Sequence, residues 1–294
     1  MRYAHILLAV AAEIWALDPQ KLDQVVAFLA LQAAGEKLPD DMVARITRQT
    51  EQAVARQEGT VAVLPLRGVI ANRMNMMSDI SGGTSSEGFG RLFDAAVVDD
   101  AVKAIILDVD SPGGAVSGTD ELSGRIFAAR GRKPIVAHVN ATAASAAYWI
   151  ATAADEMVLA PSAEVGSIGV YGVHDDLSGA LEKMGVKKTI ISAGEFKAEG
   201  NPFGPLSEEA IAHRQARVNA YNDQFIKTVA RNRGVSQSAV REGFGKGRMV
   251  MAQAAIDAGM ADSIATLDET IGRFVGAPPK RKLASAREKR ALAL

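Results

Sequence analysis

The chain has 294 residues, of which 48% are apolar and 23% are charged, and its net charge is -1 because 33 Lys and Arg face 34 Asp and Glu. This composition argues against a disordered or fibrous chain and provides no global positive field for nucleic acid or an anionic membrane. Cysteine is absent, and the four histidines form no ligand-like cluster, so we expect no disulfide, no Cys nucleophile and no metal centre. If the chain is an enzyme, its nucleophile is an oxygen or an amine.

The N-terminal residues 1–57 are rich in Ala, and their apolar spacing predicts amphipathic helices. Ile14, Trp15 and Leu17 continue the spacing of an earlier apolar run, which Glu13 interrupts. No stretch approaches the ~20 uninterrupted apolar residues that a membrane span needs. We therefore expect a helical N-terminal appendage over residues 1–57 and a cytoplasmic protein rather than an exported one.

From Thr60 onward, short apolar segments alternate with helical patterns. The predicted strands cover residues 60–66, 104–109, 134–139, 156–159 and 189–191, and the predicted helices cover residues 87–98, 116–129, 144–154 and 177–184. Such an alternation indicates an α/β domain with a largely parallel sheet, which we place at residues 58–265.

The chain after Gly204 is predicted to be helical, without further strands. Ser207 can cap a long helix that runs to about Arg233, a second helix follows Ser236, and a third covers residues 252–258. Residues 266–294 are expected to form a C-terminal helix and a basic tail. We interpret this tail as a solvated end, and the alternative is an arm for nucleic acid or an acidic partner.

Three segments that follow predicted strands carry candidate chemistry. The first is DVDSPGG, which ends in Gly113 and Gly114 and opens onto a helix. Backbone amides exposed at such a turn suit an oxyanion, although Pro-Gly-Gly is also an ordinary turn between a strand and a helix.

The second segment, VNATAASAAYWI, places Ser145 in a run of small residues at the start of an apolar helix. The small neighbours Ala144 and Ala146 would let a peptide backbone approach the hydroxyl. The alternative is that Ser145 merely caps the helix.

The third segment, SAGEFKAEGNPFGP, places Lys197 in a Gly-rich loop, and the nearby sequence GSIG offers a second hydroxyl at Ser167. A lysine in a loop is usually a solvated surface residue, so this signal is weak when it is taken alone.

Taken in order, DSPGG, ASAAYWIA, GSIGV and GEFKAEGNPFGPLSEE resemble the motifs of the signal peptide peptidase A (protease IV) family of serine peptidases. The resemblance covers roughly residues 60–265 and implies a ClpP/crotonase-type fold, a repeated ββα spiral. A helical N-terminal region without a membrane anchor further resembles the bacteriophage branch of that family, the head-maturation proteases.

The resemblance implies a serine endopeptidase with a Ser-Lys dyad, without cofactor or metal. It assigns Ser145 as nucleophile, Lys197 as general base and Ser167 as the residue that orients the lysine. Gly114, together with Gly113, would form the oxyanion hole. Ala144, Ala146 and Gly166 would line the substrate cleft. The expected substrates are scaffold or capsid proteins, and the expected assembly is a homo-oligomeric ring in the cytoplasm of the host or in the procapsid.

Elementary chemistry agrees with this assignment. A serine hydroxyl needs a base, and a lysine with the ordinary pKa of about 10.4 is protonated at neutral pH unless an apolar pocket disfavours its charge. Phe196 and Phe203 are candidate walls of that pocket, and Lys197 is predicted to be uncharged at working pH.

A Ser-His alternative would use His174 beside Asp175 and Asp176, although these residues also fit a polar turn that opens a helix. Two other function classes stay open at this point. One is an acyl-CoA enzyme of the crotonase type, and the other is a catalytically inactive capsid or scaffold component.

Overall fold

The computed structural model describes residues 13–17, 55–73 and 83–275. Its larger sheet has a parallel centre, in which β6 (Ala104–Ser111) lies between β3 (Val61–Arg67) and β8 (Ile135–Ala144). The first half of β8 pairs with β9 (Glu156–Leu159) and its second half with β10 (Glu164–Gly166), both in parallel. The remaining strands are β2 (Arg56–Glu58) and β11 (Met249–Met251), which are antiparallel, and β12 (Ser263–Ile264), which pairs in parallel with β9.

A smaller four-stranded sheet lies at the carboxyl ends of these strands. Its order is β1 (Trp15–Leu17), β7 (Gly113–Ala115), β4 (Ile70–Ala71) and β5 (Thr84–Ser85). The chain therefore passes from β3 through β4 to α5 (Ser86–Val98), and from β6 through β7 to α6 (Thr119–Ala128). The first turn adds β4 and β5 to the smaller sheet and the second adds β7, and each of these two turns ends in a helix, which confirms the predicted α/β class and its repeated ββα spiral.

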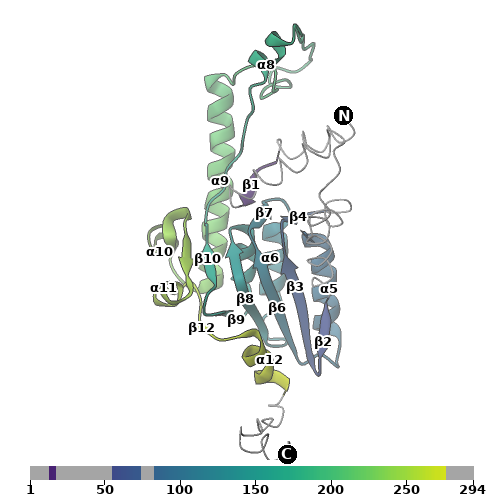
Figure 1. Cartoon of the computed structure of the whole chain (residues 1–294), viewed down its shortest axis with the longest axis vertical. Coiled ribbons are helices and arrows are strands. Elements are labelled where there is room, and N and C mark those ends of the chain that lie inside the picture. The colour runs from purple at the N-terminus through teal and green to yellow at the C-terminus, as the bar shows by residue number, and fades with distance from the viewer. Residues whose placement is uncertain (1–12, 18–54, 74–82, 276–294) are drawn as a thin grey trace, which may run out of the picture.

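The core lies between the larger sheet and the helices α5 and α6, which cover one of its faces (Figure 1). The short helix α7 (Ala146–Ala151) packs against α6, β6 and β8 in the same core. The core is filled by large apolar side chains such as Phe93, Leu107, Ile126 and Trp149. The opposite face is covered by α12 (Leu267–Val275), where Ile271 packs with Val63 and Ile106. Burial on both faces explains the continuous apolar runs of β3 and β6.

The long helix α9 (Glu208–Arg233) begins where the sequence predicts, because the Ser207 side chain accepts a hydrogen bond from the Ala210 amide. Its C-terminal half is fixed to the core, where the Phe225 ring stacks on Trp149 at 4.3 Å. After it come three short helices, α10 (Gln237–Gly243), which Ser236 caps, the 3-10 helix η1 (Gly245–Gly247) and, beyond β11, α11 (Ala252–Asp257).

Residues 172–206, which we call the arm, lie along the N-terminal half of α9, and this part of the molecule projects beyond the sheets (Figure 1). The arm contains α8 (Ser178–Lys183). Arg214 of α9 holds it by hydrogen bonds to the carbonyl oxygens of Val173 and Gly200. Much of its apolar surface is exposed, namely the side chains of Val173, Leu177, Met184, Val186, Ile190, Ile191, Phe196 and Phe203.

Several expectations were wrong. Trp15 and Leu17 belong to a strand, not to a helix, because pairing with β7 overrides the local spacing of a run too short to distinguish the two. The strand predicted at residues 189–191 does not form, and the Ile191 side chain is 95% exposed without a neighbouring strand. Conversely, β11 and β12 lie in the part predicted to be only helical. Most of residues 1–57, and the basic tail from residue 276 onward, lie outside the described residues.

Candidate active site

Ser145 lies in a sharp turn between β8 and α7. Its backbone has φ 54° and ψ -115°, a conformation that L residues rarely adopt. The surrounding structure imposes it, because the Ser145 amide donates to the Gly166 carbonyl at 2.8 Å and its carbonyl accepts from Trp149 at 2.9 Å. A strained serine between a strand and a helix is the geometry that presents a nucleophile.

The Ser145 hydroxyl is not used to cap the helix. Its side chain makes no capping hydrogen bond, and Oγ instead donates to the carbonyl oxygen of Gly169 at 3.3 Å. Ser145 is 1% exposed, so its hydroxyl is buried. The hydroxyl also makes no hydrogen bond to the amides of the first helical turn, so it does not help to form the helix. The capping alternative is therefore wrong.

Gly113 lies against this serine, and Gly114 lies against Ile70 of β4. A Cβ built on Gly113, whose φ is +101°, would be 2.9 Å from the Ala144 carbonyl oxygen and 3.1 Å from Ser145 Cβ. A Cβ on Gly114 would overlap the Ile70 carbonyl. The two glycines are therefore required by the close approach of neighbouring chains. The Gly113 amide donates to Ser111 Oγ at 3.1 Å, so that amide is already engaged in this structure.

The first residue of the DVDSPGG motif is structural. Asp108 is fully buried in β6, where it accepts a hydrogen bond from Asn140 of β8 and forms an ion pair with Arg67 of β3 at 2.5 Å. These contacts link the three central strands just before they reach the site. They fix the carboxyl end of β6, and the two glycines follow directly in β7.

Gly166 and Ser167 form the other side of the site. Gly166 has φ +124°, and its carbonyl accepts from Ser145, while Ser167 has φ 52° and its amide donates to the Arg248 carbonyl at 2.9 Å. Ser167 is thus placed one residue from a direct partner of the nucleophile. Ala144 and Ala146, the other predicted cleft residues, flank Ser145 in the chain and are buried.

Lys197 is not beside Ser145 within one copy of the chain. It lies on the arm and is exposed, and its backbone amide donates to Gly194 at 3.1 Å. Phe196 and Phe203, the predicted walls of a lysine pocket, are 52% and 39% exposed. The structure therefore brings Ser145, Gly113, Gly166 and Ser167 together and places the predicted base elsewhere.

Among the described histidines, none contacts Ser145. His174 lies on the arm, where Nε2 is 3.2 Å from the Gly204 carbonyl, and Asp176 accepts a hydrogen bond from Ser178 in the turn before α8. His138 is buried under α12, with Nδ1 3.2 Å from Thr270 Oγ1, and burial lowers its pKa. These contacts agree with structural roles for both residues.

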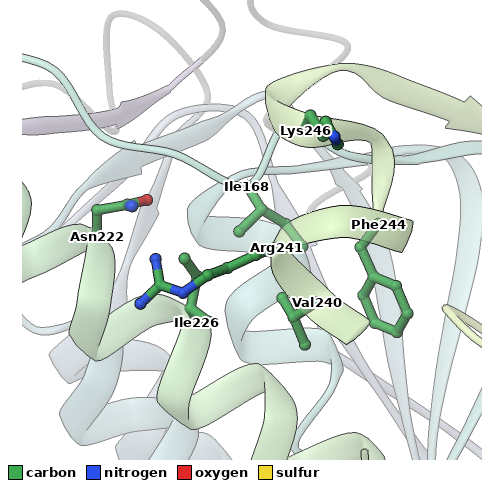
Figure 2. Close-up of a pocket in the computed structure, with 7 residues that line it drawn as sticks. All are labelled: Ile168, Asn222, Ile226, Val240, Arg241, Phe244 and Lys246. Atoms are coloured by element: carbon green, nitrogen blue, oxygen red, sulfur yellow. The ribbon is translucent and has the colours of Figure 1, made fainter. Parts of the chain in front are cut away.

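A pocket of about 320 Å³ opens behind the loop that follows Ser167. Figure 2 shows its walls, which come from α9, from α10 with the following turn, and from Ile168. Ser145 does not line it. Arg241 at its rim is paired with Asp223 of α9 at 2.9 Å. The pocket is therefore a gap between packed C-terminal helices rather than part of the serine site.

Over residues 13–17, 55–73 and 83–275, acidic and histidine side chains form no group that could hold a metal ion. In the same part of the chain, no helix combines the length and the apolar character that crossing a bilayer requires.

Sequence reasoning missed two parts of the site. One is the loop after Ser167, whose Gly169 carbonyl accepts from the serine. The other is the strand β1, which reaches the site from a distant part of the chain. Gly169 lies in the GSIGV motif, but its contact, like those of β1, is made by backbone groups, which any residue provides, so the sequence contains no signal for it.

Comparison with known proteins places these features in a family. The model of peptidase family S49 matches residues 128–275, which include Ser145, Ser167 and Lys197. Two solved structures share 18% and 14% of their residues with this chain, a membrane-bound stomatin-specific protease and ClpP1 from Listeria monocytogenes. The alignments cover 74% and 76% of this chain and 86% and 96% of those chains, with TM-scores of 0.46 and 0.45.

Two phage proteins are similar over most of this chain. The head-tail preconnector protein GP5 of Enterobacteria phage P21 is 34% identical over 218 residues, and the capsid assembly protease C of Escherichia phage lambda is 34% identical over 211 residues. The matches cover 74% and 72% of this chain, but only 43% and 48% of those proteins. The chain thus spans less than half the length of these relatives. By its matching residues, it belongs to peptidase family S49.

Proposed function

We propose that the chain is a serine endopeptidase in which Ser145 is the nucleophile. The observation that carries this proposal is the Ser145 backbone, held in a strained turn with a buried hydroxyl that caps nothing. Strain of this kind persists only where the surrounding structure imposes it, and it gathers at functional sites. The family membership and the similarity to a capsid assembly protease support the same activity.

In the proposed reaction, Ser145 Oγ attacks the peptide carbonyl while Lys197 Nζ takes the hydroxyl proton. The tetrahedral oxyanion is stabilised by backbone amides, with Gly114 and Gly113 as the proposed donors. Collapse breaks the C–N bond, and the protonated lysine returns the proton to the leaving amine. Water then hydrolyses the acyl-enzyme, again with Lys197 as base. Ser167 would orient the lysine.

The exposed position of Lys197 leads us to place the base in a neighbouring copy. The arm projects from the chain and carries Lys197 among exposed apolar side chains. Such an apolar surface favours a protein contact, and a head-to-tail ring repeats one contact around the assembly. In this proposal, the arm of one copy covers the serine site of the next, and the enclosure favours the uncharged amine.

The proposed substrates are scaffold or capsid proteins of a phage head, processed in the cytoplasm of the host or in the procapsid. The support for this class is the similarity to the two phage proteins. The chemistry of the site requires only an extended polypeptide.

A fluorophosphonate probe tests the nucleophile. We expect the full chain to be labelled at Ser145, located by mass spectrometry of peptides, and Ser145→Ala to lose the label. Ser123→Ala is the matched control, because Ser123 is also buried but donates to the Trp149 carbonyl within the helical layer. Absence of any label on the assembled wild-type protein, or labelling that persists in Ser145→Ala, would contradict the proposal.

A further inference from the structure

The strand β1 is bound on both of its edges next to the candidate nucleophile. On one edge it pairs antiparallel with β7, where Ala16 and Leu17 lie opposite Gly114 and Gly113, and the Val116 amide donates to the Ile14 carbonyl at 3.1 Å. On the other edge, Trp15 and Tyr171 exchange two backbone hydrogen bonds of 2.9 Å and 3.0 Å. The segment is thus bound between the strand β7 and the single bridge residue Tyr171.

This segment lies directly beside Ser145. The Cβ position of Gly113, which is 3.1 Å from Ser145 Cβ, is also 2.3 Å from the carbonyl oxygen of Ala16. The Ala16 peptide group and the serine side chain therefore meet at the same glycine. Tyr171, which pairs with the second edge of β1, is also close to the serine. It stands two residues after Gly169, whose carbonyl oxygen accepts a hydrogen bond from Ser145 Oγ.

The side chains of the segment are buried. Trp15 is 4% exposed, Ala16 is fully buried and Leu17 is 2% exposed. A polypeptide that binds by adding a strand uses backbone hydrogen bonds for affinity and alternate side-chain pockets for specificity. Residues 14–17 make both kinds of contact, with a small residue at the glycine and larger apolar side chains on either side.

We propose that residues 14–17 occupy the strand site of the peptidase, as a tethered ligand that an extended apolar polypeptide must displace. The inference rests on the proposed function and adds an intramolecular inhibitor to it. Both backbone edges of the site are used by β1, so no second strand can pair with β7 and Tyr171 while it is bound. A tethered ligand acts at a high effective concentration, which slows attack on every other polypeptide.

Binding in trans tests the displacement without catalysis. The protein is the full chain with Ser145→Ala, and the probe is a fluorescent peptide of residues 11–20, AAEIWALDPQ. We expect the added peptide to bind and to accelerate hydrogen exchange at the backbone amides of Trp15 and Ala16, while the Tyr171 amide stays protected. Binding that leaves the chain's own Trp15 amide fully protected would overturn the proposal.

A substitution in the segment supplies the second test. Trp15→Pro removes the amide that donates to Tyr171 and the buried ring, and should increase both peptide affinity and the rate of fluorophosphonate labelling by about tenfold. The double variant Trp15→Ala, Leu17→Ala keeps every backbone donor and should act in the same direction if Trp15→Pro does not fold. Gln57→Pro, in the three-residue edge strand β2 of the other sheet, is the control and should behave as wild type.

The outcomes separate this inference from the proposed function. If Ser145 is not a nucleophile, no variant is labelled, yet the peptide still displaces residues 14–17. If the inference fails and the function holds, wild type and both β1 variants are labelled at the same rate and bind the peptide equally.

Discussion

The two parts of the candidate dyad lie in regions of opposite character. Ser145 is buried between a central strand and a helix, where Asp120 accepts hydrogen bonds from Trp149 of α7 and Thr228 of α9. Lys197 lies on the arm, which two hydrogen bonds from Arg214 attach to α9. The candidate nucleophile is therefore held by the core of one chain, whereas the proposed base lies on an exposed surface, which in our proposal a neighbouring copy encloses.

This difference has a consequence for regulation. A rigid core can hold strain at Ser145 permanently, because strain is maintained by surrounding packing. An exposed amine remains hydrated until a partner covers it. Assembly would then switch on the base without any change in the core, and a free chain would carry a prepared serine without activity.

The largest effects are predicted for substitutions of the two candidate catalytic residues. Ser145→Ala and Lys197→Ala should each lower the rate of peptide hydrolysis by about 10³-fold or more, because the members of a catalytic unit act together. The melting temperature should change little for Lys197→Ala, whose side chain is exposed. Lys187→Ala, a second exposed lysine of the arm, is the control. Turnover near the wild-type rate in either dyad variant would refute the dyad.

A methyl group at Gly113 tests how closely the core is fitted around the serine. Gly113→Ala should cost about 1–3 kcal/mol in the free energy of unfolding and should slow labelling of Ser145, because φ is +101° and the new Cβ meets two carbonyl oxygens. Gly131→Ala is a matched control, since Gly131 has φ +79° but no atom within 4 Å of a new Cβ. Equal losses of stability in urea unfolding would show that backbone conformation alone, and not crowding at the site, limits Gly113.

A smaller effect on stability is expected from the ion pair between Arg233 and Asp262, which fixes the end of α9 to the sheet. Burial alone would raise the pKa of Asp262, but hydrogen bonds from Arg233 at 2.7 Å and from the Met157 amide lower it overall. A carboxyl group with a lowered pKa stabilises the fold above its ordinary pKa, and this contribution is lost as the pH falls through the folded-state value. Urea unfolding at pH 7 and at successively lower pH should show this loss.

Asp262→Asn should remove that pH dependence and lower the free energy of unfolding at neutral pH by up to about 1 kcal/mol, since solvent screens the partly exposed carboxylate. Asp94→Asn breaks a pair with Arg125 that is exposed on both sides, and it should have a smaller effect. An unchanged pH profile in Asp262→Asn would assign the dependence to other groups.

Local signals predicted the α/β class and the central strands, whereas the ββα spiral and the roles of the site residues were implied by the family resemblance. Period and composition predicted the central strands, and Ser207 is a correctly predicted cap because capping needs only neighbours in the chain. The ordered motifs brought Ser145, Gly113 and Ser167 to one place, since each follows a strand of the same sheet. These predictions depend on the carboxyl ends of parallel strands meeting at one edge.

The remaining errors involve partners that lie far away in the chain. Ile14 to Leu17 has a helical spacing, and only its pairing with β7 and Tyr171 makes it a strand. Ile190 and Ile191 have strand-forming side chains but no strand beside them, and both are exposed. Lys197, for which burial was expected, is likewise exposed in the single chain.

Complementation between two inactive variants tests most directly whether the neighbouring copy supplies the base. Ser145→Ala and Lys197→Ala chains are co-expressed, and hydrolysis is compared with each variant alone and with the double variant. If the arm of one copy supplies Lys197 to the next copy, random mixing of equal amounts should restore about a quarter of the sites. Each active site then needs a copy with Ser145 intact beside a copy with Lys197 intact. Activity no higher than that of the separate variants would contradict a base supplied by the neighbouring copy.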